Sequence, residues 1–186
     1  MFHDIFFALW FFLPAGLANA SPVFASRVPG LQKLGIPIDF GKTFKDKRIF
    51  GDHKTVRGFV VGTGTGLITG LLQYAAYSNS EWLQNMSLVE YKSALWSAML
   101  GIFLGFGALA GDAIKSFFKR QFSVPSGKSW FPFDQIDYIV GGLVFSSLLV
   151  DLPQRSTYLW IGLIWFLIHP LATFVGWIIG VKDSPI

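Results

Sequence analysis

The residues best suited to chemistry lie between positions 111 and 137, where long apolar segments give way to charge. On either side of a short linker, residues 111–120 and 132–137 hold three carboxylates, three cations and a hydroxyl: Asp112, Asp134, Asp137, Lys115, Lys119, Arg120 and Ser116. If the preceding helix continues, positions 112, 115, 116 and 119 share one face. Pro132 suits the first turn of a following helix, which would place both later aspartates at its start. Such a cluster suits a multiply charged ligand, and a phosphate ester with a divalent cation is the natural candidate.

The rest of the chain is apolar enough to place this cluster at a membrane. Of 186 residues, 52% are hydrophobic and only 14% are charged, against about 25% charged in an average soluble domain. The chain contains no cysteine, which excludes disulfides, thiolate zinc sites and cysteine nucleophiles. The net charge of +4 comes from basic residues that flank apolar segments, so it indicates membrane orientation or phosphate binding rather than nucleic acid.

The apolar blocks predict an all-α integral membrane protein, a bundle of five transmembrane helices forming one domain over residues 1–186. The expected spans are Ile5–Phe24, Gly58–Tyr77, Ser93–Gly111, Ile136–Val150 and Tyr158–Val181. The first block ends in a sequence that resembles a signal-peptide cleavage site, but no Lys or Arg precedes it, so we expect it to remain as a span. Asn19 should face protein or a cavity, and His169, before a proline in the last span, is expected to be a packing residue.

Glycines recur every fourth residue in the second span. These glycines are Gly58, Gly62, Gly66 and Gly70. The run Gly62-Thr63-Gly64-Thr65-Gly66 within them could suggest a nucleotide-binding loop, but a glycine stripe in an apolar segment of this length favours close helix packing.

The polar segments between the spans carry charge unequally. The first loop holds eight basic residues, namely Arg27, Lys33, Lys42, Lys45, Lys47, Arg48, Lys54 and Arg57, and the third holds Lys115, Lys119, Arg120 and Lys128. By the positive-inside rule these two basic loops and the C-terminus are cytoplasmic, and the N-terminus is outside. The glycines beside Lys-Thr in loop one resemble a phosphate loop only weakly, because the full motif is absent.

Three interpretations of the charged cluster remain open from the residues alone. The two basic loops share a face, so the three aspartates and the nearby lysines could hold Mg²⁺ and a triphosphate and stabilise a pyrophosphate leaving group. Asp112 and Asp134 could instead form ion pairs that tie the loops together. The cluster could also belong to an ion or proton pathway.

The same residues resemble the CTP-dependent cytidylyltransferases of phospholipid synthesis. Ser116–Arg120 looks like their Ser-x-x-Lys-Arg block, and Asp134–Asp137 looks like their closing Asp-Arg-x-Asp. Gln135 replaces the arginine, and the Lys-Asp and His-Gly-Gly elements between the two halves are missing. Those departures, with the small size and five spans, point to the CDP-archaeol synthase branch. Pro37–Lys42 and Arg48–Gly58 look like the first cytoplasmic loop of that branch.

The resemblance implies a reaction in which CTP and a phosphorylated dialkylglycerol, of the digeranylgeranylglyceryl phosphate type, give a CDP-activated lipid and pyrophosphate with Mg²⁺. Asp112, Asp134 and Asp137 would hold the metal and form the catalytic group with Lys119. The implied nucleotide and phosphate contacts are Lys42, Arg48, Asp52, His53, Lys54, Thr55, Lys115, Ser116 and Arg120. The implied partners are CTP, an isoprenoid ether lipid and the bilayer of the cell membrane, with no nucleic acid. A diacyl phosphatidate cytidylyltransferase and a small membrane transporter are the alternatives.

Overall fold

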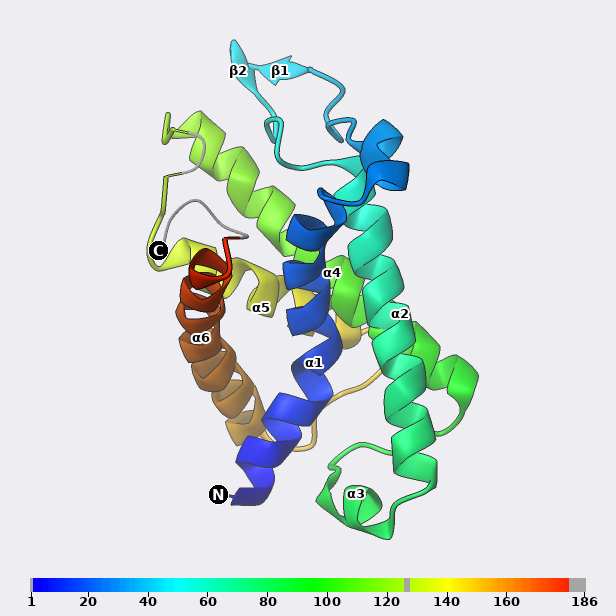
Figure 1. The fold of residues 1–186 in the computed structure, drawn as a ribbon. Helices are drawn as coiled ribbons and strands as arrows, with labels where there is room; N and C mark the ends of the chain where they lie inside the picture. Colours follow the sequence, from blue (N-terminus) through cyan, green and yellow to red (C-terminus); the bar gives the residue numbers. More distant parts are fainter. Residues whose placement is uncertain (1, 126–127, 181–186) are drawn as a thin grey trace.

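Long helices dominate the computed structural model, which describes residues 2–125 and 128–180 (Figure 1). They are α1 (Phe2–Ala25), α2 (Val56–Ser78), α4 (Ala94–Gln121), α5 (Phe133–Ser146) and α6 (Arg155–Ile178). The shorter elements are the 3₁₀ helix η1 (Pro29–Leu34), the helix α3 (Glu81–Met86) and two strands, β1 (Thr43–Phe44) and β2 (Lys47–Arg48). The strands pair antiparallel with Thr43 opposite Arg48. α4 packs against α1, α2 and α5, so it forms the centre of the bundle.

The predicted all-α membrane bundle is confirmed, although the helix count differs slightly. Within the described residues, α1, α2, α4 and α6 are long and apolar enough to cross a membrane. α5 has 14 residues and is about 21 Å long, less than the roughly 30 Å of a hydrocarbon core. It is short because it begins at the charged cluster and ends at Ser146, where the chain turns. The last residue of the expected fifth span, Val181, lies outside the described residues.

Glycines allow α2 and α4 to approach each other closely, which confirms the packing interpretation of the glycine repeat. Gly62, Gly66 and Gly70 are buried on α2. A Cβ atom added at Gly66 would collide with the carbonyl oxygen of Gly101 on α4, and one added at Gly101 would collide with that of Gly66. Both collisions involve backbone atoms, which cannot rotate away.

We therefore expect Gly66→Ala to destabilise the protein by about 1–3 kcal/mol through overpacking. The matched control is Gly64→Ala on the same helix, because nothing lies within 4 Å of an added Cβ there. That change should be neutral or slightly stabilising. Thermal unfolding in detergent would compare the two variants, and equal melting temperatures would contradict the packing argument.

The hydrophobic core lies among α1, α4, α5 and α6. Phe7, Phe11 and Phe12 of α1 are fully buried and belong to one cluster with Leu104 of α4. Two hydrogen bonds tie this core to α6: the Tyr138 hydroxyl donates to the Trp165 carbonyl at 2.7 Å, and the Trp165 indole donates to the Ala8 carbonyl at 3.0 Å. These bonds join α5 and α1 to the middle of α6.

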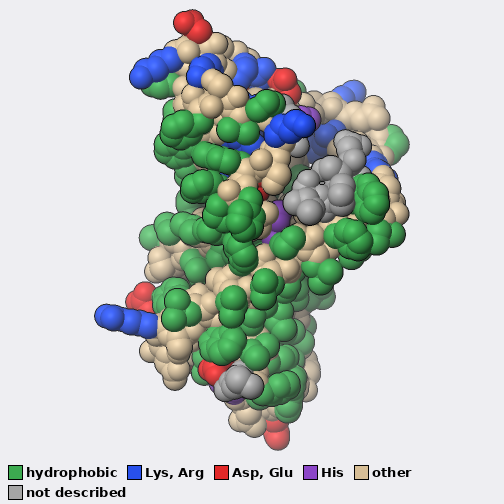
Figure 2. Space-filling model, turned by 90° about the vertical axis from the view of Figure 1, so that its left-hand side faces the viewer, with side chains coloured by type: hydrophobic (Ala, Val, Ile, Leu, Met, Phe, Trp, Pro, Cys, Tyr) green, Lys and Arg blue, Asp and Glu red, His purple; other side chains and the backbone are tan. Residues whose placement is uncertain are grey.

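The two basic loops lie together at one end of the bundle, as expected. The Lys47 ammonium group donates to the Gln121 carbonyl and the Ser123 hydroxyl, both at 2.7 Å. The Arg27 guanidinium donates to the carbonyl of Gly180 after α6. Figure 2 shows most Lys and Arg side chains gathered at this end, above a broad band of hydrophobic side chains. This distribution fits a multi-pass membrane protein whose charged end projects into water.

Candidate active site

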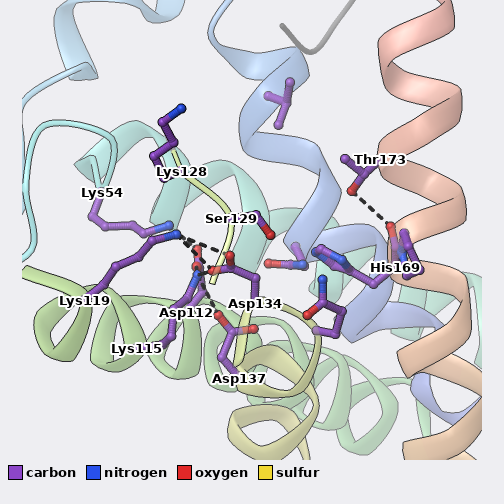
Figure 3. A pocket seen from close by; sticks show the side chains of 14 residues that line it. Lys54, Asp112, Lys115, Lys119, Lys128, Ser129, Asp134, Asp137, His169 and Thr173 are labelled. Atoms are coloured by element: carbon purple, nitrogen blue, oxygen red, sulfur yellow. Dashed lines mark hydrogen bonds and ion pairs between the residues drawn. The ribbon is translucent and has the colours of Figure 1, made fainter. Parts of the chain in front are cut away.

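A polar pocket of about 310 Å³ lies below the basic loops and is lined by side chains from α1, α4, α5, α6, loop one and the loop before α5 (Figure 3). Three aspartates and four lysines line it: Asp112, Asp134, Asp137, Lys54, Lys115, Lys119 and Lys128. α4 carries Asp112, Lys115 and Lys119 on one face, since the helix continues to Gln121. The predicted helical spacing is therefore confirmed. It places the three charged side chains of α4 in the pocket.

The Lys115 ammonium group lies at the centre of the three carboxylates. Its nitrogen is 2.5 Å from Asp134 Oδ1, 3.0 Å from Asp137 Oδ2 and 3.1 Å from Asp112 Oδ1. Lys119 also contacts Asp134, at 3.2 Å, and Lys54 forms an ion pair with the second oxygen of Asp112. With Lys128 counted, the pocket has one more lysine than aspartate, a surplus that suits an anionic ligand.

The backbone around the start of α5 fixes two of these carboxylates. Asp134, in the first turn of α5, accepts a hydrogen bond from the Trp130 amide at 2.5 Å. Asp137 accepts one from the Tyr138 amide at 2.6 Å, and its side chain is only 6% exposed. Carboxylates suit a helix N-terminus because unpaired N–H groups and the positive end of the helix dipole lie there. The predicted placement of both aspartates at the start of a helix is confirmed.

Asp39 organises loop one, although its role was not apparent from the sequence. Its side chain is fully buried, and it accepts hydrogen bonds from the Arg48 guanidinium at 2.7 Å and from the amides of Gly41, Phe50 and Gly51 at 2.9–3.0 Å. Burial alone would raise the pKa of this carboxyl, but the hydrogen bonds from Arg48 and the backbone outweigh it and hold the pKa well below its usual range. The loop thus folds around one carboxylate, which presents Lys54 to the pocket.

We expect Asp39→Asn to loosen loop one and to speed its cleavage by trypsin about tenfold, because several charge-assisted hydrogen bonds weaken together. Asp52→Asn is the matched control, since Asp52 pairs with the same arginine but is 76% exposed. In the wild type the stabilisation from Asp39 is present above the unfolded pKa of about 3.9. It is lost as the pH falls below that value through the lower folded pKa. Equal cleavage of both variants at neutral pH would contradict this role.

The structure brings together some of the predicted site residues and leaves others apart. Asp112, Asp134, Asp137, Lys54, Lys115 and Lys119 all line the pocket. Seven residues expected at the site do not line it: Lys42, Arg48, Asp52, His53, Thr55, Ser116 and Arg120.

Local roles account for several of those seven. Thr55 caps α2 by accepting from the Gly58 amide, and the Ser116 hydroxyl donates to the Asp112 carbonyl. Arg48 binds Asp39 and Asp52, Arg120 lies beside Gly51, and the others are exposed on loop one.

Polar residues other than aspartates and lysines also line the pocket. Asn19 lies there, which confirms that it faces a cavity, together with Gln135, His169 and Thr173. Gln135 is only 4% exposed, and its side-chain carbonyl has no hydrogen-bond partner among the described residues. His169 packs against Tyr138, as expected of a packing residue, but it also lines the pocket. Asn19 and His169 are polar residues within apolar segments, and this feature of the sequence could have indicated that they line the pocket.

The donor set of the pocket fits a hard divalent cation. Three carboxylates from two helices converge on a single cationic atom, and carboxylate oxygens are ligands that Mg²⁺ prefers. Within residues 2–125 and 128–180, no group of three or more acidic, histidine or cysteine side chains is already arranged around a possible metal position. The ammonium group of Lys115 lies between the aspartates, so a metal ion would have to take its place.

The fold and the pocket define an all-helical, multi-pass membrane protein with a charged site at one end of the bundle. Residues 1–186 match the family described as CarS-like CDP-archaeol synthase, and the chain belongs to that family. CDP-archaeol synthase of Methanocaldococcus jannaschii is 34% identical over 98% of each chain. That of Methanoculleus marisnigri is 38% identical over 81% of this chain and 90% of the relative. The first of these similarities spans almost the whole chain, including the pocket and loop one.

A solved structure shares the fold. It is described as an intramembrane enzyme for archaeal membrane lipid biosynthesis and superposes with a TM-score of 0.69 at 30% identity, covering 89% of this chain and 91% of the other. The resemblance noted from the sequence motifs is therefore confirmed at the level of both family and fold.

Proposed function

We propose that this protein transfers the CMP group of CTP to a digeranylgeranylglyceryl phosphate, giving a CDP-archaeol-type lipid and pyrophosphate. The observation that carries the proposal is the pocket itself, in which three carboxylates and four lysines lie where the apolar helices meet the basic loops. Membership of the CDP-archaeol synthase family supports the reaction type.

In this reaction an oxygen of the lipid phosphate attacks the α-phosphorus of CTP. The new P–O bond forms as the bond to the β-phosphate breaks, so the electron pair leaves with pyrophosphate. No covalent enzyme intermediate is needed. The chain contributes position and charge: Lys54, Lys115 and Lys119 hold phosphate oxygens and stabilise the negative charge on the leaving group. Helices α4 and α5 hold these groups in place, so little reorganisation is needed during the reaction.

Asp112, Asp134 and Asp137 are the residues that would hold Mg²⁺. When bound, the ion would supply Lewis-acid polarisation of phosphoryl oxygens and neutralise part of the triphosphate charge. The aspartates alone would repel CTP, so their proximity to lysines is as important as their number. Occupation of this position would also release Lys115 to contact a substrate phosphate.

For the orientation we propose that loop one, the 122–132 loop and the C-terminus are cytoplasmic and that the N-terminus is outside. The clustering of Lys and Arg at one end of the bundle supports this arrangement through the positive-inside rule (Figure 2). CTP would then reach the pocket directly from the cytoplasm.

The test is pyrophosphate release by the purified protein with CTP, Mg²⁺ and one of two lipids. Release with the isoprenoid ether lipid phosphate alone is the expected result. Release with a diacylglycerol phosphate alone would make the protein a phosphatidate enzyme. No release with either lipid, from protein that elutes and melts as a folded species, would overturn the proposal and favour the transporter alternative.

A further inference from the structure

A large apolar groove runs along the outer side of α4 and α5, on the other side of Lys115 and Asp137 from the polar pocket. Its volume is about 820 Å³, within the roughly 300–1,000 Å³ that is usual for ligand sites. On α4 its wall includes Ile114, Phe118 and Phe122 at a spacing of four residues. These side chains are exposed.

The opposite wall comes from α5. Ile136, Val140 and Val144 recur at the same spacing and are also exposed. Gly111 and Gly141 form the floor, where α4 and α5 are in such close contact that a Cβ atom on either glycine would meet the backbone of the other helix. Beside this contact, apolar side chains of both helices border the groove.

Lys115 and Asp137 line both the groove and the polar pocket, and they are the only residues that line both within the part of the chain described. Their side chains are 3.0 Å apart and form the boundary between the two spaces. A ligand with an anionic head and apolar chains could therefore place its head against the Lys115 ammonium group while its chains remain in the groove. Among the residues that the structure describes, no other charged side chain lines the groove.

We propose that the groove between α4 and α5 holds the hydrocarbon chains of the phospholipid substrate, and that the lipid phosphate meets CTP at Lys115. This inference rests on the proposed function for the identity of the reaction. It adds the route of the lipid, which enters sideways from the bilayer, while the nucleotide occupies the pocket on the other side of Lys115. The chains extend from Lys115 toward Val144 and Phe145, deeper along the helices.

A second apolar space is less suited to the hydrocarbon chains of the lipid. The slot between α1 and α6 also adjoins the polar pocket, through Asn19, Val23, His169 and Thr173. Its volume is only about 100 Å³, and none of the described residues that line it is a lysine or an aspartate. It therefore offers too little space for two long chains and no charge for a phosphate.

Val140→Trp would fill the groove and tests the proposal. We expect the KM for the lipid to rise about tenfold or more, because apolar contacts in a fitted site have effects of that order, while the KM for CTP stays unchanged. Val60→Trp on α2 is the matched control: Val60 and Val140 are 56% and 51% exposed, and Val60 lines none of the three cavities. Ala172→Trp fills the slot instead and should leave the KM for the lipid unchanged.

Photo-crosslinking separates this inference from the proposed function because it needs no turnover. A glycerol phosphate lipid with a diazirine near the end of one chain should label residues 136–145 of wild-type protein, as located by mass spectrometry.

Labelling there without pyrophosphate release would reject the function and retain the groove as a lipid site. Turnover with labelling confined to α1 and α6, or a raised lipid KM in Ala172→Trp alone, would overturn the groove. Dissociation of a dimer by Val140→Trp with an unchanged lipid KM would identify the face as a subunit interface and also overturn it.

Discussion

Replacing Asp134 by asparagine is expected to lower the rate of pyrophosphate release on the order of 10³-fold while the protein still folds and inserts. Asp134 binds Lys115 and Lys119 and lies one helical turn from Asp137. Asparagine keeps the shape and can still accept the hydrogen bond from the Trp130 amide, so α5 should begin as before. It removes the negative charge that positions two lysines and that would contact the metal, and such preorganised charge is commonly the largest contribution to catalysis.

Asp46→Asn is the matched control for this variant. Asp46 is exposed at the tip of the β1–β2 hairpin with a φ of 61°, a left-handed conformation that asparagine also tolerates. Its activity should equal that of the wild type. Detergent gel filtration and thermal melting check that both variants are folded. Near-normal activity of folded Asp134→Asn would remove Asp134 from the catalytic group.

The sequence was sufficient to predict the bundle because its apolar blocks are long and the charges are clustered. The α2 glycines and the extension of α4 through Lys119 follow from helical spacing. The limited length of α5 was harder to foresee. Hydropathy around 136–150 suggests a full span, but Asp134 and Asp137 already belong to the helix, and the chain turns after Ser146. Helix length there depends on tertiary contacts rather than on local composition.

The candidate site was predictable where residues share one helix and less so where they come from a loop. Loop one contains eight basic residues, and of these only Lys54 lines the pocket among the described residues. Arg48 was expected to contact phosphate, but its guanidinium is held by Asp39. Nothing in the spacing of these charges distinguishes a lysine that reaches the pocket from an arginine that holds the loop together. That distinction depends on which carboxylate is buried.

Lys115→Met should lower the rate of turnover on the order of 10³-fold. It should at the same time strengthen the binding of a divalent cation. Lys115 is the one ammonium group described within 3.1 Å of all three aspartates. Methionine has a similar length without the charge, so the carboxylates lose their shared partner and should attract another cation. We expect Mn²⁺, followed as the loss of its free EPR signal, to bind about tenfold or more tightly.

Lys128→Met is the matched control for Lys115→Met. Lys128 lines the same pocket, and no ion pair joins it to a carboxylate among the described residues. Its loss should leave Mn²⁺ affinity nearly unchanged. If crowding of three carboxylates destabilises Lys115→Met, Mg²⁺ should raise its melting temperature more than that of the wild type, since a ligand stabilises the state that binds it. Equal Mn²⁺ affinity in folded Lys115→Met and wild-type protein would show that Lys115 does not occupy the metal position, and the aspartates would then serve to position lysines.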